Sequence, residues 1–163
     1  MTYPVTYSQL TPASVLELIQ QQHLDLANGY SLELTSSLDD CWSVEDLCET
    51  YGKVMWSDGR QRPPGFDGSA EVLDRSRGLR LWWQPYREGK QVYKDCRSAV
   101  CEILEYGLYC YTVSLHGPAL DNAGNTHIVR LASDTIGGVE PLLSDTQLLP
   151  IVDDLLSCLF ASL

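Results

Sequence analysis

Residues 94–115 read KDCRSAVCEILEYGLYCYTVSL, and the spacing of the apolar residues changes once within this stretch. Gly107 stands at the change, and it is free to take the positive φ that ends many helices. From Leu108 onward apolar and polar residues alternate, which predicts a strand. Before it, apolar residues recur at steps of three and four, which predicts one face of a helix formed by Cys96, Ala99, Val100, Ile103 and Leu104.

The residues before this stretch add further expected elements. Thr11-Pro12 predicts a helix start, and Asn28-Gly29 predicts a turn before which that helix ends. The alternation over 30–36 predicts a strand with one wet face. Further along we expect a short helix over 44–50, a strand over 53–56, a long loop region over 57–78 and a strand over 79–83.

The residues after it complete the fold. We expect a turn-rich connection over 116–125, a hairpin partner for 108–115 over 126–132, and a chain break at Gly137-Gly138. Ser144 caps a last helix, which Pro150 interrupts or bends. The order predicts an α+β fold: a mainly antiparallel sheet of four to five strands, with two long helices and one short helix packed on it. At this length we expect a single domain over residues 1–163.

Charge is distributed unevenly along the chain, whose net charge is −11. Residues 1–52 carry eight acidic and no basic residues, residues 53–97 carry a net +4, and residues 98–163 a net −7. This balance disfavours binding to nucleic acid or to an anionic membrane. It favours a partner protein with a basic surface.

Neither the termini nor the cysteines indicate secretion. The first residues lack a signal peptide, and no apolar run is long enough to span a bilayer, so we expect a cytoplasmic protein. In that compartment the six cysteines are expected to be reduced. Cys101, on the polar side of the central helix, is expected to be the one accessible thiol.

An acidic cluster precedes the first basic residue and is the expected partner-binding face. Its spacing does not match a calcium loop, and neither does the segment 121–125. The alternative is a solvated acidic surface with no binding role. The cluster comprises Asp39, Asp40, Glu45, Asp46 and Glu49.

Cysteine and histidine spacings predict no zinc site, and we expect neither a metal nor another cofactor. Cys110 and His127 are expected on neighbouring strands, where Asp121 or Asp134 could orient the histidine for nucleophilic catalysis. No motif accompanies them, so a packed thiol and a satisfied histidine are the simpler interpretation. We therefore assign no catalytic residues, and an enzymatic role stays only an alternative.

A mixture of cations and tryptophans between 60 and 87 provides an alternative ligand-binding region. Such a surface can stack a nucleotide or single-stranded nucleic acid. It can equally be structural, with Trp83 in the core and Trp82 covered by arginine stems. The candidate residues are Arg60, Arg62, Arg75, Arg77, Arg80 and Trp82.

Three segments together resemble small acidic proteins of bacteriophages, especially those of actinobacterial hosts. They are 64–68 (PGFDG) followed by 82–85 (WWQP), the corner at 105–107 (EYG), and 132–140 (ASDTIGGVE) before the last helix. The resemblance spans about residues 30–156 and implies a phage setting and no catalytic residues.

Two functions follow from these patterns. The first is a non-enzymatic, phage-encoded acidic protein in the host cytoplasm that docks on a host protein, and inhibits a nucleic-acid-binding or defence factor by mimicking an acidic surface. The second is a domain that binds a small ligand or nucleotide, or an enzyme, with Cys110, His116 or His127 nearby. A virion structural component and a homodimer are further alternatives.

Overall fold

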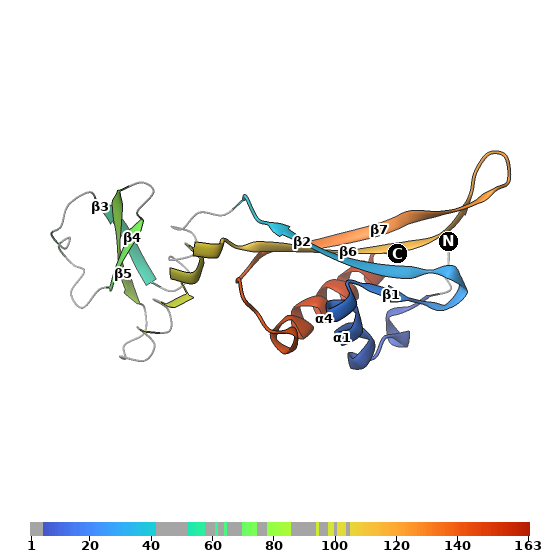
Figure 1. Ribbon diagram of the computed structural model, residues 1–163, viewed down its shortest axis with the longest axis horizontal. Coiled ribbons are helices and arrows are strands. Elements are labelled where there is room, and N and C mark those ends of the chain that lie inside the picture. Colours follow the sequence, from blue (N-terminus) through green and yellow to red (C-terminus); the bar gives the residue numbers. More distant parts are fainter. Residues whose placement is uncertain are drawn as a thin grey trace. The chain divides into compact units, whose positions relative to one another are not determined.

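The computed structural model describes residues in two compact units (Figure 1). The first unit comprises residues 1–38 and 109–163, and the second comprises residues 39–108. No helix within the described part of the chain is long and apolar enough to cross a lipid bilayer. The described residues are 5–41, 52–57, 61, 64, 70–74, 78–85, 94, 98–99, 101–103 and 105–163.

The first unit is an α+β fold built on a four-stranded antiparallel sheet, as the sequence predicts. Its strands follow the order β1-β2-β6-β7, and β6 and β7 form a long hairpin (Figure 1). The helices α1 and α4 lie on one face of this sheet. The elements in chain order are η1 (Tyr7–Gln9), α1 (Pro12–Gln21), β1 (His23–Asp25), η2 (Ala27–Gly29), β2 (Ser31–Leu38), β6 (Tyr109–Leu120), β7 (Thr126–Val139) and α4 (Asp145–Ala161).

Helix α1 begins where the sequence predicts and ends earlier. The Thr11 hydroxyl accepts a hydrogen bond from Ser14 N, and Pro12 occupies the first turn. Gln22 then takes a left-handed conformation with φ of 59°, which ends the helix. The helix therefore stops well before Asn28. The residues between them include the edge strand β1, which was not predicted from the sequence.

The core of the first unit lies between the sheet and the two helices. Leu32 and Leu34 of β2 and Val113 and Leu115 of β6 point to the helices and are almost fully buried. Burying one such side chain stabilises a fold by about 1.5–3 kcal/mol. The helices contribute Val15, Leu18 and Ile19 from α1 and Leu148, Val152, Leu155, Leu156 and Leu159 from α4.

Helix α4 runs through Pro150 without interruption. Ser144 caps it: the Ser144 hydroxyl accepts a hydrogen bond from Gln147 N, while Gln147 Oε1 accepts one from Ser144 N. Tyr7 Oη also donates to Asp153 Oδ1 at 2.7 Å, which ties η1 to α4 and raises the pKa of Tyr7. Of the two outcomes predicted at Pro150, the interruption is therefore wrong, and the bend stays a prediction.

The β6–β7 hairpin is longer than predicted and contains two bulges. Residues 116–120, expected in a connection, continue β6. Gly137 and Gly138, expected to break the chain, stand in β7 opposite the single residue Cys110, with Gly138 at a φ of 69°. A second bulge places Leu131 as an extra residue between the pairs Leu115–Ala132 and His116–Arg130.

Two parts of this hairpin differ in their surroundings. The hairpin base, residues 109–117 and 131–139, lies beside β2 and under the helices. The hairpin arm, residues 118–130, forms strand pairs only within the β6–β7 hairpin, has no pair with β2, and projects from the sheet (Figure 1). Every residue from 121 to 130 is exposed.

The second unit contains a separate three-stranded antiparallel sheet. Its strands are β3 (Gly52–Ser57), β4 (Ala70–Asp74) and β5 (Leu79–Pro85), in the order β3-β5-β4. The sequence correctly predicts β3 and β5 but assigns them to the main sheet. Strand β4 lies inside the expected loop region 57–78, so that prediction is wrong at 70–74.

The helix predicted at the start of residues 94–115 is described in part. Residues 94, 98–99, 101–103 and 105–106 are helical, and Ile103 is buried. Gly107 has a φ of 80° and donates a backbone hydrogen bond to Ile103 O at 2.8 Å, so it ends the helix as predicted. The expected short helix over 44–50 lies outside the described residues.

Candidate functional site

The sheet face opposite α1 and α4 carries polar side chains. Residues that are directly paired in an antiparallel sheet share a face, so the register defines the rows on it. One row crosses all four strands as His23, Glu33, Ser114 and Ser133. The next row consists of Asp25, Ser31, His116 and Arg130.

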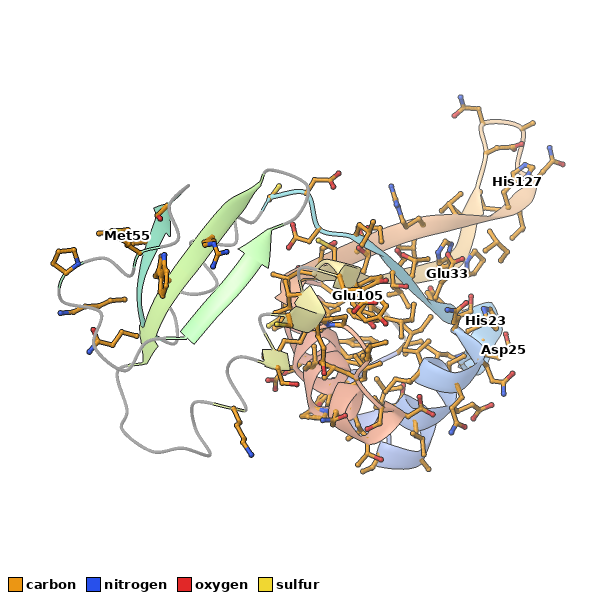
Figure 2. The ribbon with its side chains drawn as sticks, turned by 60° about the vertical axis from the view of Figure 1, so that its left-hand side comes forward. His23, Asp25, Glu33, Met55, Glu105 and His127 are labelled. Atoms are coloured by element: carbon orange, nitrogen blue, oxygen red, sulfur yellow. The ribbon has the colours of Figure 1, made fainter. Side chains whose placement is uncertain are left out.

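Two histidine–carboxylate pairs lie in these rows, and Figure 2 labels three of their four residues, His23, Asp25 and Glu33. His23 Nε2 is 3.0 Å from Asp25 Oδ1, within one strand. His116 Nε2 is a buried atom 3.2 Å from Glu33 Oε2, and it forms no hydrogen bond with any described residue. That contact is therefore an ion pair only when His116 is protonated. Both pairs lie on the sheet face opposite the helices and offer polar groups for recognition.

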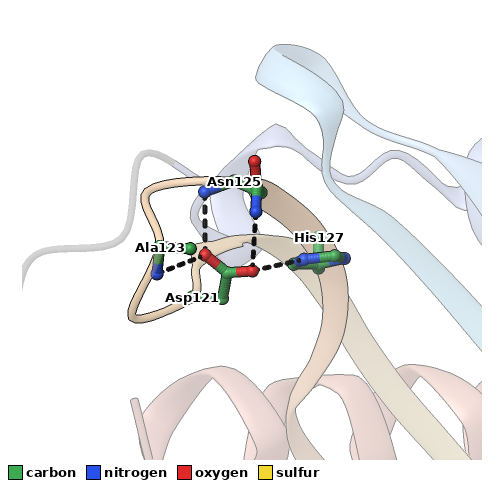
Figure 3. Close-up of polar contacts among 4 residues, drawn as sticks. All are labelled: Asp121, Ala123, Asn125 and His127. Atoms are coloured by element: carbon green, nitrogen blue, oxygen red, sulfur yellow. Dashed lines mark hydrogen bonds and ion pairs between the residues drawn. The ribbon is translucent and has the colours of Figure 1, made fainter.

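The third histidine belongs to the tip of the hairpin arm (Figure 3). Asp121 Oδ1 accepts hydrogen bonds from Ala123 N and Asn125 N, both at 2.8 Å. Asp121 Oδ2 lies 3.0 Å from both Asn125 Nδ2 and His127 Nε2. These contacts, those from Asn125 first, lower the pKa of Asp121 to about 2. The arrangement is that of a closed turn in which the carboxylate is already satisfied.

Cys110 and His127 lie on the neighbouring strands β6 and β7, as predicted, but the alternative in which they form a catalytic pair is excluded by their separation. His127 stands opposite Ala119 on β6, nine positions along the strand from Cys110. At the rise of a strand this separates them by roughly 30 Å. Asp121 does contact the histidine, as one of the two expected orienting acids, whereas Asp134 Oδ1 accepts from Thr135 N. No nucleophile–base pair forms from these residues.

The predicted acidic face is described only at its start. Asp39 is half-buried, and its Oδ1 accepts a hydrogen bond from Cys41 N at 2.9 Å. Asp40 is exposed, as a docking surface requires. Glu45, Asp46 and Glu49 lie outside the described residues.

The alternative basic region is described at two of its six residues. Arg80 and Trp82 share one face of β5, the central strand of the second sheet. Arg80 is half-buried, and Trp82 is 7 % exposed, so Trp82 is a buried side chain and not a stacking platform. Among the described residues its Nε1 has no hydrogen-bond partner. Arg60, Arg62, Arg75 and Arg77 lie outside the described residues.

The thiols do not single out one reactive cysteine. Cys101 is exposed, as predicted, but Cys41 and Cys158 are exposed too. Cys110 is half-buried. Among the described residues no group of three or more histidine, cysteine or acidic side chains could hold a metal ion.

One feature that sequence reasoning missed is an apolar surface on the hairpin arm. Leu120 is 73 % exposed and Ile128 is 61 % exposed. The register places Ile128 opposite Pro118, and Leu120 lies two residues after Pro118 on the same strand. Pro118, Leu120 and Ile128 therefore share one face of the arm. The sequence has apolar residues on both sides of the turn at residues 121–125. That they share a face could be seen only once the structure extended both strands to that turn.

Comparison with known proteins adds no relative: no family model, curated protein or solved structure matches this chain.

Proposed function

We propose that this protein is a non-enzymatic, phage-encoded binding protein that docks on a basic surface of a host protein. The observation that supports this most is the charge of the first unit. Over residues 1–38 and 109–163 Arg130 stands against nine acids, for a net charge of −8. These acids are Glu17, Asp25, Glu33, Asp121, Asp134, Glu140, Asp145, Asp153 and Asp154.

Several of these acids are available to a partner. Glu17 on α1 and Asp154 on α4 are exposed, as is Asp25, whose side chain is 90 % accessible. A surface of one sign accelerates the approach of an oppositely charged partner and excludes partners of like charge. Binding of this kind weakens as salt increases, because the Debye length falls.

The hairpin arm supplies the apolar contact that charge alone lacks. Interfaces have a desolvated apolar centre surrounded by polar residues, and exposed apolar patches often mark binding sites. Leu120, Ile128 and Pro118 form such a patch. We propose a host protein whose basic surface otherwise faces nucleic acid, so that the acidic unit inhibits it by occupying that surface.

The test is capture of partners from host lysate on the immobilised protein. We expect partners to bind at low salt, to elute as salt rises and to elute with duplex DNA. The variant Glu17→Lys/Asp154→Lys should lose at least fivefold of the captured partner, because both sites are exposed. Ser157→Gln, a neutral change at an exposed site of α4, is the matched control. Capture that ignores salt and the charge reversal would contradict the proposal.

Trp82 supports a second candidate, binding of a small ligand or nucleotide by the second unit. An indole N–H that is buried without an acceptor is costly, and a bound ligand could supply the acceptor. A thermal-shift screen with nucleotides tests this. The expected hit stabilises the wild type and not Trp82→Phe, which keeps a ring and removes the donor. Equal shifts in both proteins would exclude a role for this N–H.

A further inference from the structure

The free edge of β1 borders a groove on the first unit. The groove has a volume of about 330 Å³, at the lower end of the range for ligand sites. Gln9, Leu10 and Ser14 line one side, and Leu24, Asp25 and Leu26 line the other. Three leucines thus provide an apolar floor next to an exposed carboxylate.

The backbone along this edge is available for pairing. Leu34 N donates to Gln22 O at 3.0 Å, and Leu26 N donates to Tyr30 O at 2.8 Å. Because bonded pairs alternate in an antiparallel ladder, the N–H and C=O groups of His23 and Asp25 point away from β2. Among the described residues none pairs with these groups from the free side. Such an edge is a template for an added strand.

The side chains along the edge specify the chemistry of that strand. Asp25 Oδ1 receives a hydrogen bond from His23, and its second oxygen has no partner among the described residues, which leaves it available to an incoming cation. Leu24, between them, faces the opposite side and lines the groove. A strand laid on β1 would therefore place cations beside Asp25 and an aliphatic side chain in the groove.

We infer that β1 accepts an extended segment of the partner protein with alternating basic and aliphatic residues, added as an antiparallel strand. This inference rests on the proposed docking on a basic protein and names its mode: charge attracts the segment, and backbone pairing holds it in register. In antiparallel pairing, residues opposite His23 and Asp25 lie on the same face as these two residues, which is where the basic side chains belong. Because the N–H and C=O groups of His23 and Asp25 point outward, the backbone of those basic residues forms the hydrogen bonds to the edge.

Methylated peptides test backbone pairing separately from charge. The probe is acetyl-Lys-Val-Lys-Val-Lys-amide, titrated into the protein while the amide signals of His23 and Asp25 are followed by NMR. N-methylation of the lysines removes the donors that face β1, and it should weaken binding roughly tenfold or more. N-methylation of the valines, whose N–H groups point away from β1 to solvent, is the matched control with the same charge and should leave affinity within about twofold.

The same experiment separates the two proposals. Salt-sensitive binding that both methylated peptides retain would overturn strand addition and leave acidic docking in place. Absence of binding by every peptide at low salt would overturn strand addition. The proposed docking on a basic protein would then still be tested by capture of partners from host lysate. Any result in which methylated lysines do not weaken binding more than methylated valines overturns the inference.

Variants of Asp25 provide a second measurement on the protein side. Asp25→Asn removes only the charge and should weaken the unmethylated peptide a few-fold. Asp25→Pro also removes the outward N–H, at an edge position where proline costs no bond to β2, and should abolish binding. Circular dichroism checks that each variant folds. Equal affinity of a folded Asp25→Pro and the wild type would contradict strand addition.

Discussion

The hairpin base and the hairpin arm are made by the same two strands, yet burial divides them sharply. In the base, Val113 and Leu115 are fully buried between β2, β7 and the helices. In the arm, Leu120 and Ile128 continue the same hairpin and are more than half exposed. Apolar residues in a strand therefore belong to the core only where another layer covers them. Beyond that layer they form an exposed apolar surface that can contact a partner.

The largest expected effect is in the base. Leu115→Ala removes a side chain that is 0 % exposed and leaves a cavity, so the free energy of unfolding should fall by about 2–5 kcal/mol. Chemical denaturation measures this. Leu120→Ala in the arm is the matched substitution. Similar losses for both would contradict the division between base and arm.

A smaller loss is expected at the outer end of the base. A Cβ at Gly117 would lie 2.5 Å from Tyr30 Cε1 and 2.7 Å from Leu131 Cδ1, because the tyrosine ring packs on the bare backbone. Gly117→Ala should therefore destabilise by about 1–3 kcal/mol through overpacking. Tyr30→Leu combined with Gly117→Ala should recover part of this loss in the same denaturation experiment. A stabilised single variant would show that the ring moves freely.

The arm should show an acid-dependent effect confined to its tip. The pKa of Asp121 is lowered to about 2, so its ionised form stabilises the folded tip above the ordinary aspartate pKa. That contribution diminishes between about pH 4 and pH 2 and is lost as pH falls through the folded value. Carboxyl NMR titration should show this low pKa, and His127→Ala should raise it. An unshifted value in the wild type would show that the tip is open in solution.

The smallest effect on stability is expected on the apolar face of the arm. Leu120→Ser should change the free energy of unfolding by no more than about 0.5 kcal/mol, because the side chain is 73 % exposed. If the arm contacts the partner, the same variant should still reduce capture from lysate. Intact capture would remove the arm from the proposed interface and leave the charged surface.

Much of the fold was predictable from periodicity and caps. The alternation over 30–36, the Gly107 corner and the Ser144 cap each depend on a few local residues, and all three are confirmed. Strand β1 was missed because three residues are too short to show a period. Gln22 ends α1 in a left-handed conformation that glycine usually takes, so the sequence carries no clear sign of it.

Glycine and proline misled the prediction in the hairpin. Gly117 and Pro118 resemble a turn, but Gly117 makes room for Tyr30, and Pro118 lies beyond the last β2 pair, where its missing N–H costs no bond to β2. Gly137 and Gly138 form a bulge, which one strand alone does not reveal. The candidate site was less predictable for the same reason: the His116–Glu33 pair and the open edge of β1 depend on the register and order of the strands.

The extra residue Leu131 falls at the junction between base and arm. A bulge bends its strand and increases the local twist, so it determines the direction in which the hairpin arm leaves the sheet. Deleting Leu131 would leave every cross-strand partner from Tyr111 to Leu120 matched as before, since the residue has none of its own. The direction in which the arm is aimed is thus adjustable separately from the pairing that builds it.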